Sequence, residues 1–156
     1  MKFISNVLKN SFGSMVSGID IEFVDALDGR KYCQVKLGPN TINRDDVETI
    51  HNHFKGARNL GRTNNVKVAH GDLVVAILYG EQGQESGHYK RLRDEYVYPL
   101  FIGQEFWHRL TGDENFYAEL RQAIAEVAIE ARGAILLDET VHQLAATPEI
   151  KKLAGQ

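Results

Sequence analysis

Residues 18–44 read GIDIEFVDALDGRKYCQVKLGPNTINR, and this stretch predicts two strands joined by a short turn. Apolar and polar residues alternate over residues 19–25, and the alternation resumes over residues 30–37 after the turn signal Asp28-Gly29. Because the side chains of a strand point alternately to the two faces of a sheet, a hairpin would gather four polar side chains on one face. These are Asp20, Glu22, Gln34 and Lys36. Such a face is either a solvated hairpin surface or a metal-dependent phosphodiesterase site.

The composition is that of an ordinary globular protein. The chain has 156 residues, 43% hydrophobic and 25% charged, which favours a single domain. The one cysteine, Cys33, excludes an intramolecular disulfide and fits a reducing cytoplasm, and no apolar run is long enough for a membrane span. The histidines lack zinc-site spacing, and we expect His51 and His53 to be solvated. The net charge of −3 does not indicate nucleic-acid binding, although a local basic patch would suffice for it.

Periodicity predicts the remaining elements. Helical apolar spacing and cap signals predict helices over residues 1–12, 43–59, 104–110 and 111–132, with further helical turns over 134–146 and 148–154. Residues 88–96 are either a short helix or an irregular segment. Continuous apolar runs predict strands over residues 73–79 and 97–102. The order α-β-β-α-β-β-α-α predicts an α/β fold, a mixed β-sheet core flanked by helices.

Hydrolysis of a phosphodiester with a divalent metal needs a few oxygen ligands for a hard cation and a group that activates water. Asp20, the side-chain oxygen of Gln34, the carbonyl of Val35 and the Lys36 ammonium supply those parts on two adjacent strands. The spacing alone is also compatible with a hairpin surface. Its cross-strand pairs would contribute only about 0.2–1 kcal/mol each.

Several longer segments of the sequence resemble segments of a known protein family. They are Gly18-Ile19-Asp20-Ile21-Glu22-Phe23, Tyr32-Cys33-Gln34-Val35-Lys36 and the following residues 37–43, then residues 101–107 and 110–117. In their order these segments resemble the PD-(D/E)XK nuclease superfamily and, within it, the type II restriction endonucleases. In that family an acid or Gln, any residue and then Lys end the catalytic strand, often before a Gly-Pro-Asn-Thr type of turn.

The resemblance implies a restriction-endonuclease-like fold and specific residue roles. Asp20 would be the invariant metal ligand, Gln34 would stand where the family has Glu, Asp or Gln, and Lys36 would be the catalytic lysine. The expected cofactor is Mg²⁺, bound by Asp20, Gln34 and Val35, with no organic cofactor. The expected partner is double-stranded DNA cut at a specific site by a cytoplasmic homodimer, since two-fold symmetry suits a palindromic site.

The sequence departs from the family pattern in two ways. Gln34 is neutral, so Glu22 would have to supply additional negative charge for the cation. Family members usually carry more chain before the catalytic hairpin, whereas residues 1–17 contain no Asp or Glu. We therefore expect residues 1–156 to form one nuclease-like domain without the family's N-terminal elements. The alternatives are a non-catalytic DNA-binding or assembly module on a degenerate nuclease fold, and a junction or repair nuclease of the same superfamily.

Candidate DNA contacts follow the second strand. Asn40, Thr41 and Asn43 either bind a phosphate or hold the turn and cap the next helix. Basic side chains in two further regions either contact the DNA backbone or form solvated faces: Arg44, Lys55, Arg58, Arg62 and Lys67, then Lys90, Arg91 and Arg93. We expect base readout near the loop over residues 80–87, with Arg91 and Arg93.

Overall fold

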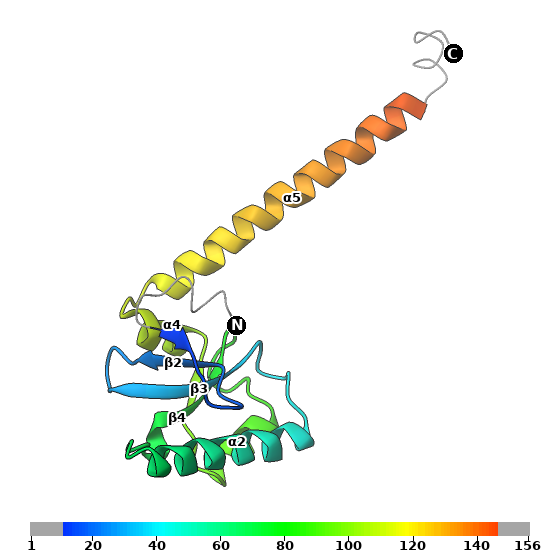
Figure 1. Cartoon of the computed structure of the whole chain (residues 1–156). Coiled ribbons are helices and arrows are strands. Elements are labelled where there is room, and N and C mark those ends of the chain that lie inside the picture. The colour runs from blue at the N-terminus through cyan, green and yellow to red at the C-terminus, as the bar shows by residue number, and fades with distance from the viewer. Residues whose placement is uncertain (1–10, 147–156) are drawn as a thin grey trace. The chain divides into compact units, whose positions relative to one another are not determined.

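The computed structural model describes residues 11–146, and Figure 1 shows the arrangement of the elements. In chain order these are β1 (Ser11–Gly13), β2 (Ile21–Val24), β3 (Arg30–Lys36), α2 (Arg44–Thr63), a 3₁₀ turn η1 (His70–Asp72), β4 (Leu73–Ile77), α3 (Gly87–Asp94), β5 (Leu100–Ile102), α4 (Gln104–Thr111) and α5 (Phe116–Ala146). The chain divides into two units between Tyr117 and Ala118. The first unit holds the whole sheet.

The sheet is mixed, as the sequence predicts. Its strand order is β1-β2-β3-β4-β5, antiparallel from β1 to β3 and parallel from β3 to β5. A parallel neighbour requires a crossover connection, and α2 supplies it between β3 and β4. Every residue of β4 is buried, which fits a central strand covered on both faces.

The helices cover both faces of this sheet. Val47, Ile50 and Phe54 of α2 are buried in one core cluster with Val75 and Ile77 of β4. On the opposite face, the ring of Phe23 in β2 meets Phe106 of α4 edge to face, with the ring centroids 6.3 Å apart. Figure 1 shows α2 and α4 on opposite sides of the strands. Phe106 and Trp107 are buried and belong to the core on this face.

Two strand predictions are corrected. Residues 11–13 form the edge strand β1, so the helix predicted over residues 1–12 does not reach Ser11, and the rest of that prediction lies outside the described residues. Only three residues pair there, too few for a visible alternation. β5 begins at Leu100 and not at residue 97. Val97 has φ 59°, a left-handed conformation that cannot continue a strand, and Pro99 precedes the first paired residue.

Two helix predictions are also corrected. α2 continues to Thr63, past the predicted end near residue 59. The predicted capping box at Thr111 and Glu114 does not form, because Thr111 closes the last turn of α4 and its hydroxyl donates to the Trp107 carbonyl at 2.7 Å. α5 begins instead at Phe116 and runs without a break to Ala146. The helix predicted over residues 148–154 lies outside the described residues.

In the second unit, the residues that the structure describes all belong to α5. Two apolar side chains of this helix, Ile124 and Val127, are 61% and 64% exposed. The described part of this unit offers no other element to cover them. Within residues 11–146, no helix is long and apolar enough to cross a membrane.

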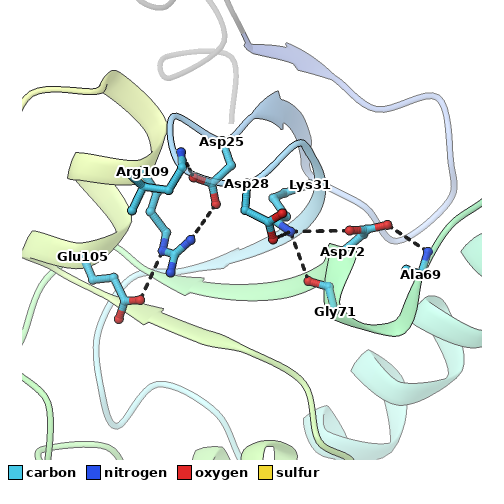
Figure 2. A network of polar contacts seen from close by, with 9 residues as sticks. Asp25, Asp28, Lys31, Ala69, Gly71, Asp72, Glu105 and Arg109 are labelled. Carbon is cyan, nitrogen blue, oxygen red and sulfur yellow. Dashed lines mark hydrogen bonds and ion pairs between the residues drawn. The ribbon is translucent and has the colours of Figure 1, made fainter.

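A polar network joins the hairpin turn to α4 and to the start of β4 (Figure 2). The Asp25 side chain is fully buried and accepts a hydrogen bond from Arg109 of α4 at 2.9 Å. The Lys31 side chain is 2% exposed, and its ammonium lies 2.7 Å from Asp28 and 3.4 Å from Asp72. These ion pairs stabilise the turn between β2 and β3 on the side of the sheet that carries α4.

Candidate active site

The candidate site lies where β2 begins and β3 ends. Asp20 immediately precedes β2, and its backbone N–H donates to the Cys33 carbonyl at 2.9 Å. Its carboxylate accepts the N–H of Val35 at 2.7 Å. The pairing of β2 with β3 stops at this point. The Asp20 carboxylate thus accepts a backbone N–H of β3 in place of a carbonyl from the neighbouring strand. Asp20 is nevertheless exposed, so it remains open to a ligand.

Val35 contributes backbone atoms to the same edge. In an antiparallel ladder one residue presents its N–H and its C=O to the same neighbouring strand. Because the N–H of Val35 meets the Asp20 carboxylate, its carbonyl faces the edge beyond the start of β2. The Val35 side chain packs on the opposite face of the sheet and is buried.

Gln34 and Lys36 share the face of β3 that α2 covers, as alternation predicts. They lie beside Val75 and Ile77 in the parallel register with β4. Gln34 is buried, 5% exposed, whereas Lys36 is partly exposed. In the described part of the chain, no carboxylate forms an ion pair with the Lys36 ammonium. The lysine is therefore available for a substrate.

The Gln34 amide has an unexpected neighbour in His53 of α2. Its nitrogen Nε2 lies 2.7 Å from His53 Nδ1 and also donates to the Gly18 carbonyl. No described residue donates to its oxygen Oε1, which is buried. His53 is partly exposed, but its ring also contacts Gln34, so it is not solvated on all sides. The signal for its position was its helical spacing, three residues after buried Ile50 and four before buried Ala57.

Glu22 is engaged elsewhere. One carboxylate oxygen accepts from the Ser14 hydroxyl at 2.7 Å, and the other lies 3.5 Å from the Arg30 guanidinium. Burial, together with the charge of Glu22, raises the pKa of neighbouring Tyr32. Both oxygens of Glu22 thus have protein partners, which weakens its candidacy as an extra metal ligand.

The turn after β3 is held by its own side chains. The Thr41 hydroxyl donates to the Gly38 carbonyl at 2.8 Å and lies 3.1 Å from the Tyr89 hydroxyl of α3. Asn43 caps α2 by accepting from the N–H groups of Asp45 and Asp46, which confirms its predicted capping role. Asn40 is exposed at the tip of the turn.

The candidate DNA-binding arginines differ in their surroundings. Arg91 pairs with Glu95 at 2.7 Å, and Arg93 pairs with Asp94 at 2.8 Å and with buried Glu85 at 2.5 Å. Hydrogen bonds to Asp94 and Glu85 raise the pKa of Arg93. A surface pocket on α2, by contrast, is lined by cations and one amide: Lys55, Arg58, Asn59 and Arg62. Nearby, burial lowers the pKa of His51, and the charge of Lys55 lowers it further.

The oxygens at the start of β2 and the end of β3 are of the kinds that a small hard cation takes as ligands. The Asp20 carboxylate, the unpartnered Gln34 oxygen and the Val35 carbonyl come from adjacent residues of paired strands. Among residues 11–146 there is no group of three or more His, Cys, Asp or Glu residues that could hold a metal ion. A cation would therefore depend on neutral oxygens, water and substrate phosphate, which is common for Mg²⁺.

A mixed sheet with an acid before β2 and a Gln-x-Lys ending β3, covered by a crossover helix, is consistent with the fold of the PD-(D/E)XK nucleases. Within that class, residues 1–132 match the family model of the type II restriction endonuclease EcoO109I, and the chain belongs to this family. No curated protein matches the chain. Membership places the chain among the nucleases of restriction systems, which cleave DNA.

Proposed function

We propose that the chain is a Mg²⁺-dependent restriction endonuclease that hydrolyses double-stranded DNA at a specific site. The observation that carries this proposal is the buried, unpartnered oxygen of Gln34, whose neighbour in sequence, Val35, donates its N–H to the Asp20 carboxylate. An unpaired buried acceptor is unfavourable unless a donor or a cation reaches it.

The proposed domain is the single nuclease-like domain expected from the sequence. The buried Cys33 thiol fits a cytoplasmic location.

The protein residues would divide the chemistry among them. Asp20, Gln34 and Val35 would hold the cation, which when bound stabilises the negative charge that develops on the scissile phosphate. Lys36, acting as a neutral amine, would orient the attacking water and take a proton from it, and the ammonium so formed would neutralise part of the same charge. Burial of Gln34 and the fixed β-strand backbone of Val35 would keep their oxygens in place before substrate arrives.

We propose that two copies act as a homodimer, because two-fold symmetry matches the cleavage of both strands of a palindromic site. The four-residue α2 pocket is our candidate for a contact with the DNA backbone, since its cations are not paired with carboxylates of the described residues. Arg91 and Arg93 are weaker candidates, because each already has a carboxylate partner.

One cleavage experiment tests this function. Incubating the full chain with a defined plasmid and Mg²⁺ is expected to give a fixed set of bands on a gel, and a chelator is expected to stop the reaction. Smearing would indicate a general nuclease and would contradict site specificity. Intact DNA, together with measurable DNA binding, would favour the second candidate, a non-catalytic module. Two observations motivate that candidate, the neutral Gln34 and the protein partners of Glu22.

The α2 pocket makes a separate prediction about salt. Replacing Lys55, Arg58 or Arg62 by Gln is expected to weaken DNA binding and to lower the slope of log affinity against log salt. Each lost phosphate contact should reduce the slope by about 0.9. Filter binding without metal over a range of salt concentrations measures this slope. Arg91→Gln is the matched control and should leave the slope unchanged. If the variants of Lys55, Arg58 and Arg62 gave the same slope as the wild type and Arg91→Gln, the α2 cations would only form a solvated face.

A further inference from the structure

The orientation of the Gln34 amide can be worked out from its two neighbours. The Gly18 carbonyl can only accept hydrogen bonds, so the amide atom beside it must be the NH₂ group. One hydrogen of that group is directed to Gly18. The second acceptor within reach is His53 Nδ1, 2.7 Å away. The position of the amide oxygen is then determined, because it is the remaining end of the group.

The same contacts determine the tautomer of the imidazole ring. Since the Gln34 NH₂ group donates, His53 Nδ1 must accept, and the ring hydrogen lies on Nε2. Both amide hydrogens of Gln34 are then used. Its oxygen is left buried without a donor among the described residues. Turning the amide over would set its oxygen against the Gly18 carbonyl, where two acceptors would face each other.

We propose that His53 is a positioning residue that holds the Gln34 amide with its oxygen presented to the divalent cation. This inference rests on the proposed function, in which Gln34 is a ligand. A carboxylate has two equivalent oxygens and binds a cation in either orientation. An amide has one oxygen and needs a partner that selects its orientation, and outer partners of this kind commonly set metal affinity. His53 would thus set the orientation of a metal ligand that is Gln and not a carboxylate.

Gly18 completes this arrangement by leaving room for the ring. A Cβ atom built on Gly18 would lie 2.1 Å from His53 Cγ, closer than any real contact, and Gly18 has φ 81°. Glycine is the residue that adopts this conformation without strain and allows such an approach. The backbone before β2 and helix α2 therefore meet at Gln34, with the imidazole between them.

The chain of residues 1–156 without DNA provides the test. His53→Leu removes the acceptor, His53→Asn keeps an oxygen near the position of Nδ1, and His51→Leu changes the other histidine of α2, which contacts Tyr98 and not Gln34. Calorimetric titration with Mg²⁺ is expected to show affinity about tenfold weaker for His53→Leu. His53→Asn should restore the affinity, and His51→Leu should leave it unchanged. An affinity of His53→Leu equal to that of the wild type would overturn the proposal.

Two spectroscopic measurements test the geometry without metal. The ¹⁵N shifts of the neutral His53 ring in the wild-type chain are expected to place the hydrogen on Nε2, and a hydrogen on Nδ1 would overturn the proposal even if a variant failed to fold. The Gln34 side-chain NH₂ signal should move in His53→Leu and stay in His51→Leu. Neither measurement requires cleavage, so inactivity of the wild-type enzyme would count against the proposed function alone.

Discussion

Replacing Lys36 by alanine is expected to abolish DNA cleavage while leaving DNA binding largely intact. The Lys36 ammonium lies at the end of β3 without a carboxylate partner in the described structure, so its removal leaves no unpaired buried charge. General acid–base assistance contributes about 10²–10⁴-fold to rates, so we expect cleavage to fall by about 10³-fold or more. Single-turnover cleavage of a plasmid with saturating Mg²⁺ measures the loss, and filter binding without metal measures the affinity.

Asp20 offers a matched comparison. Asp20→Asn keeps an oxygen that can accept the Val35 N–H but removes the negative charge that the cation requires. We expect it to abolish cleavage with little change in thermal stability, whereas Asp20→Ala should abolish cleavage and also lower stability. Metal-dependent cleavage that persists in both Lys36→Ala and Asp20→Asn would exclude the proposed active site.

Arg109→Leu is expected to lower the free energy of unfolding by about 3 kcal/mol, in the range for breaking a buried ion pair. It would leave the fully buried Asp25 carboxylate with the Leu27 N–H, at 2.8 Å, as its remaining described hydrogen bond. The guanidinium also lies over the Phe101 ring, 4.3 Å from its centroid, so packing is lost as well. Urea denaturation followed by circular dichroism measures the change.

The control for Arg109 is Arg91→Leu, which breaks an exposed pair with Glu95. Exposed pairs contribute little because water solvates both charges, so this variant should unfold close to the wild-type midpoint. A second variant, Asp25→Asn with Arg109→Leu, should recover part of the lost stability because no buried charge remains unpaired. Equal midpoints for Arg109→Leu and Arg91→Leu would show that the Asp25 pair does not stabilise the fold.

Strand alternation is a local property, and it predicts the parts of the site that lie on one hairpin. It places Asp20, Gln34 and Lys36 on one face, and the structure pairs β2 with β3 so that Asp20 reaches Val35. The buried run of β4 likewise predicts a central strand, which the sheet order confirms. These features depend on spacings of two residues and on a turn, both of which are visible in a sequence.

Contacts between distant segments were not predictable in the same way. His53 lies 19 residues after Gln34 on a helix whose rotation against the sheet is set by packing of the whole apolar face. Arg109 reaches Asp25 across 84 residues. Glu22 was a reasonable extra ligand by alternation, but Ser14 and Arg30 occupy its oxygens. The left-handed Val97 depends on the tertiary setting of its loop, which no local propensity encodes.

In the proposed site, the hydrogen bond from Val35 to Asp20 would make DNA cleavage depend on the register of β2 against β3. A slip of one residue between β2 and β3 would turn every side chain of the moving strand to the other face. Ile19 or Ile21 would then occupy the place of the carboxylate, although the strand content would stay the same. A compact state with native secondary structure and loose packing should therefore look normal by far-ultraviolet circular dichroism and cut no DNA.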